Sequence, residues 1–238
     1  MTCEVILVTG ASRGLGARMA KGFLTKGYLV IGLARSPLET WEGEPNERFE
    51  GHVCDITDES MVKRLFSDLR KRHGRLDALI NNAGAFSSDL LLTASADRFG
   101  SLLRANLVSA QVVTREAVKL MRPKGFGRVV SISSIATTIP LTGNALYSIT
   151  KVGLETLMQG FAVEFKGSGI TFNSIGISFL EDTGMVNALN HAARTSYESR
   201  LLEPHPLRIG EIMHALGFFL SDQAGAVTGQ QITLGSPF

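Results

Sequence analysis

The chain has 238 residues, of which 44% are hydrophobic and 19% are charged, and its formal net charge is +2. This length suits one α/β domain with a substantial core, and the composition is that of an ordinary globular protein. Because the charge is small and no apolar stretch reaches membrane-spanning length, we expect neither a nucleic-acid partner nor a membrane segment. Cys3 and Cys54 form no disulfide framework or metal motif, and no signal peptide precedes the first strand, so we expect reduced thiols in a cytoplasmic protein.

The first predicted strand, at residues 4–9, runs into the segment Thr9-Gly-Ala-Ser-Arg-Gly-Leu-Gly16 and then into a helix. A strand, a glycine turn and a helix N-terminus in this order are typical of a binding site for a dinucleotide pyrophosphate. We expect Gly10 to allow the tight turn, Gly14 to let the backbone approach a phosphate, and Gly16 to let the helix pack close to the sheet. A plain glycine turn is the alternative interpretation.

The amphipathic helix at 15–26 leads to a second predicted strand at 28–34, which ends in Ala34-Arg-Ser36. An NAD site usually places an acidic residue near this strand end, where it accepts hydrogen bonds from the ribose hydroxyls. This strand end carries no acid, and Arg13 and Arg35 instead suit a 2′-phosphate through charge-assisted hydrogen bonds. We therefore predict NADP(H) rather than NAD(H); in the alternative, both arginines are solvated surface residues.

The third predicted strand, at 48–54, is joined to a helix at 58–73 by the segment Cys54-Asp-Ile-Thr-Asp58. Asp58 is the expected N-cap of that helix, because an aspartate there accepts hydrogen bonds from the first free N–H groups. The helix ends in the basic run Arg70-Lys-Arg-His73, which we interpret as a solvated helix end rather than a nucleic-acid patch.

The fourth predicted strand, at 76–81, ends in Asn81-Asn-Ala-Gly84, and small and amide residues at this end of a parallel strand lie along a ligand crevice. A long helix at 101–122 and a strand at 127–133 follow. Asn106 lies inside the helix, where an asparagine is mildly unfavourable, so it calls for a specific reason.

A set of reactive side chains surrounds the start of the next helix, at 146–166: Tyr147 and Lys151 are four residues apart, and Ser134 precedes the tyrosine by thirteen. A lysine one helical turn from a tyrosine lies on the same helix face, and its positive charge favours the phenolate. We therefore expect Lys151 to lower the pKa of Tyr147, so that the tyrosine exchanges a proton with a carbonyl or alcohol oxygen held by Ser134.

The remaining predicted elements are a strand at 169–175, a helix at 208–221 and a strand at 230–234. Between them lies an irregular region at 177–207, in which we expect a short helix near 183–199. Irregular regions of this length are commonly functional, and we interpret this one as a substrate lid.

The alternation of strands and helices predicts right-handed crossovers and a mostly parallel sheet with helices on both faces. The fold class is thus α/β, a doubly wound sheet of the Rossmann type with about seven strands. We expect one domain over residues 1–238 that binds the dinucleotide and carries out catalysis.

The motifs of this chain, from Glu4 to about Leu234, resemble those of the short-chain dehydrogenase/reductase family. The match is to its single-domain branch and to proteins like the 3-oxoacyl-acyl-carrier-protein reductases. The motifs that carry the resemblance are Gly10-x3-Gly14-x-Gly16, Asn81–Gly84, Asn106, Ser134, Tyr147 and Lys151.

The resemblance implies a role for each matching position. The catalytic residues would be Asn106, Ser134, Tyr147 and Lys151. Asn106 would bond a water that links Lys151 to solvent; alternatively it is a structural amide. The cofactor would contact Gly10, Ser12, Arg13, Gly14, Leu15, Gly16, Arg35, Ser36, Asp55, Ile56, Asn82, Ala83, Gly84, Tyr147 and Lys151. The substrate would contact Ser134, Tyr147, Phe86, Leu141, Phe179 and Met185. No metal is expected.

Two segments depart from the family's pattern. Ile177 and Ser178 stand where the family usually has Pro-Gly, close to the nicotinamide, so proline's rigidity and glycine's freedom are both lost there. At the C-terminus, Leu234-Gly-Ser236 replaces the usual Asp-Gly-Gly, which often packs at a subunit contact.

The expected activity is NADPH-dependent reduction of a ketone to a secondary alcohol, with an apolar ketone such as a 3-oxoacyl thioester favoured by the apolar residues expected around the site. Two other classes stay open: an NADP-binding sensor without turnover, and an enzyme that modifies sugar nucleotides. By resemblance, a homo-oligomer, a tetramer or a dimer, would form through the helices at 101–122 and 146–166.

Overall fold

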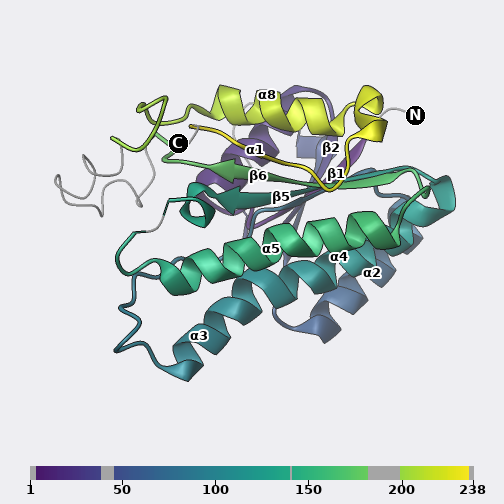
Figure 1. Ribbon diagram of the computed structural model, residues 1–238. Coiled ribbons are helices and arrows are strands. Elements are labelled where there is room, and N and C mark those ends of the chain that lie inside the picture. Colours follow the sequence, from purple (N-terminus) through teal and green to yellow (C-terminus); the bar gives the residue numbers. More distant parts are fainter. Residues whose placement is uncertain (1–3, 39–45, 140, 182–198, 236–238) are drawn as a thin grey trace.

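The computed structural model describes residues 4–38, 46–139, 141–181 and 199–235 (Figure 1). Within these residues, parallel strands form a seven-stranded sheet, which confirms the predicted sheet of about seven strands; their order is β3-β2-β1-β4-β5-β6-β7. The strands are β1 (Val5–Thr9), β2 (Leu29–Ala34), β3 (Phe49–Val53), β4 (Ala78–Asn81), β5 (Gly127–Ser134), β6 (Ile170–Ile177) and β7 (Gln231–Thr233).

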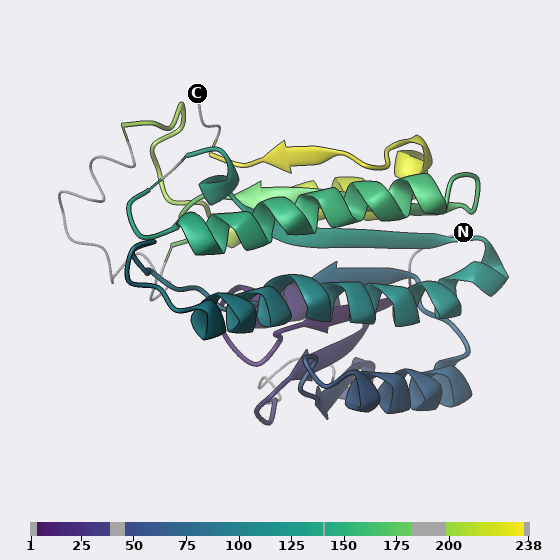
Figure 2. The ribbon, with the colours of Figure 1, turned by 60° about the horizontal axis from the view of Figure 1, so that its bottom comes forward.

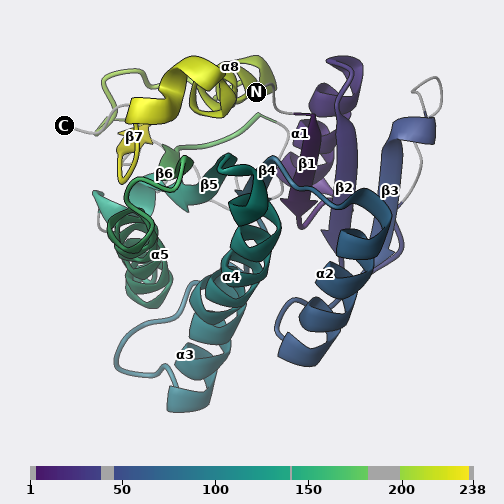
Figure 3. The ribbon, with the colours of Figure 1, turned by 90° about the vertical axis from the view of Figure 1, so that its right-hand side faces the viewer.

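Helices cover both faces of the sheet. They are α1 (Gly14–Thr25), α2 (Glu59–His73), α3 (Ala96–Leu103), α4 (Ser109–Met121), α5 (Ala145–Glu164) and α8 (Ile209–Leu220), with 3-10 turns η1 (Asn46–Arg48), η3 (Arg122–Lys124), η4 (Ile135–Thr137) and η5 (Asp222–Ala226). In Figure 3, α1 and α8 lie on one side of the sheet and α2, α4 and α5 on the other.

The two faces of β1 show how the core divides between these layers. Ile6 and Val8 pack with α1 and α8, whereas Val5 and Leu7 pack with α2, α4 and α5. Successive side chains of a strand point to opposite faces, so a strand buried on both faces reads as a continuous apolar run. Each described helix is too short or too polar to cross a membrane.

The strand order reverses beside β1, since β2 and β3 follow it on one side and β4 to β7 on the other. At such a switch point the loops after two neighbouring strands diverge and leave a crevice at their carboxyl ends. Here the crevice lies between β1 and β4, and Thr9 ties the two strand ends together: its Oγ1 accepts hydrogen bonds from the N–H groups of Asn82 and Ala83, both at 3.0 Å.

The single helix predicted at 101–122 is wrong in its start and in its regularity. The helical run begins at Ala96, where Ser95 accepts a hydrogen bond from the N–H of Arg98 at 3.2 Å and caps it. It then passes through a π-helical segment, η2 (Arg104–Val108), before continuing as α4. Figure 2 shows these parts following one another along one axis.

The region predicted as a lid was expected to start at residue 177. Strand β6 instead continues to Ile177, which pairs with Ser134, so the region starts one residue later. Its base is closed by a parallel bridge between Leu180 and Leu207, with the N–H of Leu207 donating to the Phe179 carbonyl at 2.7 Å. The helix predicted near 183–199 lies almost wholly outside the described residues.

Candidate active site

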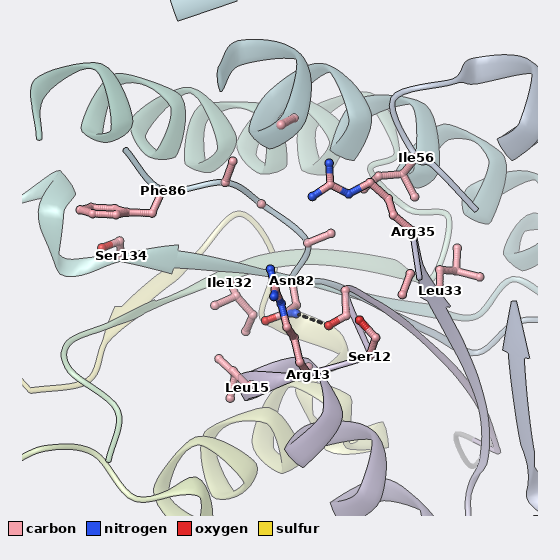
Figure 4. Close-up of a pocket in the computed structure, with 18 of the residues that line it drawn as sticks. Ser12, Arg13, Leu15, Leu33, Arg35, Ile56, Asn82, Phe86, Ile132 and Ser134 are labelled. Atoms are coloured by element: carbon pink, nitrogen blue, oxygen red, sulfur yellow. Dashed lines mark hydrogen bonds between the residues drawn. The ribbon is translucent and has the colours of Figure 1, made fainter. Parts of the chain in front are cut away.

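A cavity of about 940 Å³ opens at the carboxyl ends of the central strands (Figure 4). Its walls come from the β1–α1 loop, the ends of β2 and β3, the segment after β4, the end of β5, the start of α5 and the segment after β6. Of the residues predicted to hold cofactor or substrate, it is lined by Gly10, Ser12, Arg13, Gly14, Leu15, Gly16, Arg35, Ser36, Asp55, Ile56, Asn82, Ala83, Gly84, Phe86, Ser134, Tyr147, Lys151 and Phe179.

The glycine loop is built by close backbone contact. Gly10 has a φ of +71°, a conformation that L side chains rarely adopt. A Cβ on Gly16 would lie 2.1 Å from the Gly10 carbonyl oxygen, so only glycine lets α1 start this close to the loop. Gly14 has no atom within 4 Å of the place where its Cβ would be, which leaves open space in front of the helix N-terminus. Free N–H groups and the helix dipole make this space suitable for a phosphate.

Two exposed arginines flank this part of the cavity, Arg13 from the loop and Arg35 from the end of β2. In Figure 4 their guanidinium groups point toward the open space between the two elements. Asp55, after β3, is partly engaged by Thr57, whose N–H and hydroxyl donate to one carboxylate oxygen at 3.0 and 2.8 Å. Asp58 caps α2 as predicted, accepting from the N–H groups of the two residues that follow Glu59.

The asparagines after β4 fix the floor of the cavity. Asn81 is buried and donates to Thr114 at 2.9 Å, which ties β4 to α4. Asn82 donates to the Thr9 carbonyl at 2.9 Å and so holds the segment after β4 against the glycine loop. These two contacts fasten the end of β4 to α4 and to the glycine loop.

Asn106 is buried and bonds to the chain just after Gly84. Its Oδ1 accepts from the N–H of Ala85 at 2.6 Å, while its Nδ2 donates to the Ala85 carbonyl and to Thr150 Oγ1, both at 2.9 Å. Both amide hydrogens therefore have protein partners. Asn106 clamps this segment, and its predicted contact with a water stays a prediction.

Ser134 and Tyr147 meet at one end of the cavity, where the Ser134 hydroxyl acts on the Tyr147 hydroxyl and favours its ionised form. Tyr147 is held from the other side by an edge-to-face contact with Phe86, with ring centroids 5.2 Å apart. The neighbouring Ser133 also lines the cavity, but its hydroxyl bonds to Glu155 of α5.

Lys151 lies beneath the tyrosine, with Nζ 5.7 Å from the ring centroid of Tyr147 and donating to the Ile132 carbonyl at 2.8 Å. Burial lowers the pKa of Lys151 to about 8, against a smaller opposing effect of Glu155. Burial also raises the pKa of Tyr147, and the bond to Ser134 only partly offsets this. The expected lowering of the tyrosine pKa by the lysine is therefore not found, because desolvation dominates at this position.

The predicted substrate contacts divide into three groups. Phe86 and Phe179 line the cavity, together with Leu180. Leu141 instead packs against the apolar cluster of Ile135, Ile139, Phe179 and Leu201, and it is not among the described residues that line the cavity. Met185 lies outside the described residues. No group of three or more His, Cys, Asp or Glu side chains suited to a metal occurs among the described residues.

Three polar residues of the site were missed by the sequence analysis. Thr9 joins the two strand ends, and Thr150 accepts from Asn106 and donates to the Tyr147 carbonyl at 2.7 Å. Glu155 follows Lys151 by one helical turn. Polar side chains on the inward face of an otherwise apolar helix were the available signal for Thr150 and Glu155.

Known dehydrogenases and reductases are similar to this chain in sequence and in structure. A sequence model of the short chain dehydrogenase family matches residues 4–194. The chain is 30% identical over 235 residues to the 3-oxoacyl-(acyl-carrier-protein) reductase FabG of Salmonella typhimurium, with 96% of this chain and 94% of that protein covered. A solved structure of a putative gluconate dehydrogenase from Agrobacterium tumefaciens is similar, with a TM-score of 0.87, 27% identity, and 98% and 95% of the two chains covered. So is 4-hydroxyisoleucine dehydrogenase complexed with NADH, with a TM-score of 0.84, 25% identity, and 98% and 97% covered.

Proposed function

Because the chain belongs to the short chain dehydrogenase family of oxidoreductases, we propose that it is an NADPH-dependent reductase that converts a ketone into a secondary alcohol. The observation that carries this proposal is the group of Ser134, Tyr147 and Lys151 at one end of a cavity whose other end is the glycine loop. A proton donor and a dinucleotide site thus share one space.

The bound nicotinamide would supply a hydride to the carbonyl carbon, which is the cofactor's own chemistry. Ser134 donates a hydrogen bond to the carbonyl oxygen and orients it. Tyr147 gives its hydroxyl proton to that oxygen as the C–H bond forms, so the C=O becomes an alcohol. A raised pKa keeps Tyr147 in its phenol form, which is the form that can donate.

Lys151 then stabilises the phenolate left on Tyr147, because its ammonium lies under the ring in a site shielded from water. It would also hold the ribose of the nicotinamide. Asn106 keeps the segment after Gly84 in place, and a Cβ on Gly84 would lie only 3.0 Å from Asn106 Oδ1, so glycine lets the two pack closely.

NADP(H) is the proposed cofactor because Arg13 and Arg35 stand beside the cavity where the end of β2 lacks an acid. Two guanidinium groups bind a 2′-phosphate far better than two ribose hydroxyls. One similar structure is complexed with NADH, so both cofactors belong in the test. We expect NADPH to bind at least tenfold more tightly than NADH, and Arg35→Ala to remove most of this preference.

The proposed substrate is a ketone with an apolar body, such as a 3-oxoacyl thioester. Phe86, Phe179 and Leu180 give the substrate end of the cavity an apolar wall. A relative at 30% identity is named for reduction of 3-oxoacyl groups on acyl carrier protein, which supports this class over a charged sugar nucleotide. A homo-oligomer and a cytoplasmic location are further parts of the proposal.

The competing function is an NADP-binding sensor without turnover. Its only support is the Ile177-Ser178 pair, which lines the cavity and stands where the family usually has Pro-Gly. The grouping of Ser134, Tyr147 and Lys151 in one cavity speaks against it, since a sensor has no use for an assembled proton donor.

Tyr147→Phe tests the proposal most directly. The variant keeps the ring and its contact with Phe86 but removes the proton that the carbonyl oxygen needs. We expect kcat with a 3-oxoacyl thioester or a bulky cyclic ketone to fall by about 10³-fold or more, with NADPH affinity changed by less than about threefold. Near-normal kcat would refute the assignment. Tight NADPH binding without turnover in the unaltered protein, over a broad ketone panel, would favour the sensor.

A further inference from the structure

Glu155 is a half-buried acid on the inward side of α5, one helical turn beyond Lys151. Tyr147, Lys151 and Glu155 follow one another at intervals of four residues, which places all three along one face of the helix. Nothing in the proposed reaction uses the acid, although an unpaired carboxylate in such a position is unfavourable. Its contacts therefore need a reason.

The carboxylate of Glu155 is held by hydrogen bonds from two strands. Its Oε1 accepts from the Ser133 hydroxyl of β5 and from Gln231 Nε2 of β7, the latter at 2.8 Å. Burial raises the pKa of Glu155, and the Ser133 and Thr137 hydroxyls partly offset this. Two donors on one oxygen fix the side chain against the sheet edge near β7, which lies beside α5 in Figure 3.

These contacts place the acid between two parts of the candidate active site. On one side it holds Ser133, whose neighbour in the chain is Ser134. On the other side, Glu155 is the charged group, among the described residues, that raises the pKa of Lys151. The other titratable group near the lysine is Tyr147, on the same helix; β5, η4, β7 and the segment after β4 present only hydroxyl, amide or backbone groups to the pair.

We propose that Glu155 is a positioning residue of this site: it is the counter-charge that keeps Lys151 protonated, and it anchors the β5 end that carries Ser134. This inference rests on the proposed reductase function for its catalytic meaning. Burial alone favours a neutral lysine, which could not stabilise the Tyr147 phenolate. A carboxylate one turn away partly offsets that burial without blocking the cavity, since Glu155 is not among the described residues that line it.

The pairing can be measured without any substrate. Two pairs of proteins are compared: the unaltered protein with Lys151→Met, and Glu155→Gln with the double variant. In each pair the difference between the two urea midpoints is followed against pH, and its slope bends at the pKa of Lys151. We expect the bend near pH 8 in the first pair and at least about half a pH unit lower in the second. Glu155→Gln keeps an amide oxygen for Ser133 and Gln231, so folding should survive.

Glu164→Gln is the matched control, since Glu164 is an exposed acid at the end of the same helix. A pair made in that background should bend at the same pH as the unaltered pair. An unmoved bend in the Glu155→Gln pair overturns the proposal.

A second readout ties the acid to catalysis. In Glu155→Gln the alkaline limb of NADPH-dependent ketone reduction should shift down by the same amount, whereas a purely structural role would lower kcat equally at every pH. A uniform loss therefore also overturns the proposal. If no protein of the set turns over a ketone but the bend shifts, the charge pair stands and the reductase function fails.

Discussion

At the scale of single residues, burial sets the chemistry of the candidate active site. Lys151 is buried, and removal from water shifts its pKa from about 10.5 in an unfolded chain to about 8. Between these two values the unfolded chain binds a proton that the folded chain does not, so the free energy of unfolding rises with pH. Below pH 8 the folded protein carries the penalty of a charged, desolvated lysine.

Lys151→Met should remove this pH dependence. From pH 7 to pH 9.5 the unaltered protein should gain about 2 kcal/mol of unfolding free energy relative to the variant. Urea titrations of both proteins at the two pH values measure the difference, and all other titrating groups cancel. An unchanged difference would mean that the lysine titrates as if it were in water.

A second prediction concerns the glycine loop. Gly16→Ala would bring a Cβ to 2.1 Å from the Gly10 carbonyl oxygen, which is backbone and cannot swing aside. We expect a loss of about 1–3 kcal/mol in unfolding free energy and at least tenfold weaker NADPH binding. Gly217→Ala is the control, because Gly217 lies in α8 with no atom near its Cβ position; it should gain about 0.5–1 kcal/mol. Equal effects of the two changes would contradict the packing explanation.

The four-residue spacing placed Tyr147 and Lys151 on one face, because the period of a helix fixes which side chains share a face, whereas Ser134 was selected by the resemblance to the family. The direction of the Tyr147 pKa shift was not predictable in this way. It depends on how much water the folded chain excludes from the hydroxyl, and spacing carries no measure of that. Glu155 was missed for the same reason: its partners come from β5 and β7, distant in sequence.

At the scale of elements, the helical run from α3 to α4 shows a limit of reading periodicity. The apolar pattern predicted one regular helix, whereas the structure has a π-helical segment at Arg104–Val108. Such segments often occur at functional sites. Here the segment carries the buried Asn106, whose amide reaches across to the backbone of Ala85. A mid-helix asparagine was the only hint in the sequence.

Asn106→Ala tests whether this amide is structural. The change leaves the Ala85 N–H and carbonyl without their partner, and we expect the unfolding free energy to fall by about 2 kcal/mol. Urea denaturation measures this, and ketone reduction is assayed in parallel under conditions where the variant is folded. A variant of full stability that has lost turnover would instead support the predicted role of Asn106 in a proton path.

At the scale of the whole molecule, the parallel sheet and the helices on both faces followed from the alternation of strands and helices. What did not follow is how the outer helices meet a partner. Ile149 and Val152 of α5 are about half exposed, as is Val108 of η2, and Val163 is more exposed still. Apolar side chains three residues apart form one outward stripe, which is a common feature of subunit interfaces.

We expect the protein to be a dimer or a tetramer in solution through this stripe. Multi-angle light scattering should report at least twice the 25.6 kDa of one chain. The double variant Ile149→Glu and Val152→Glu should be monomeric with an unchanged circular dichroism spectrum, because it adds like charges to a surface that excludes them. A monomer for the unaltered protein would remove this part of the proposal.

The bridge between Leu180 and Leu207 has a consequence for how proteins of this design diversify. The chain leaves the sheet after β6 and is hydrogen-bonded to itself again where Leu207 meets Leu180. Both ends of the segment between these two leucines are therefore fixed at one place. Closing a longer or shorter loop over a fixed gap changes the free energy only slowly with length. We therefore expect insertions and deletions between these two leucines to leave the residues around the cavity in place.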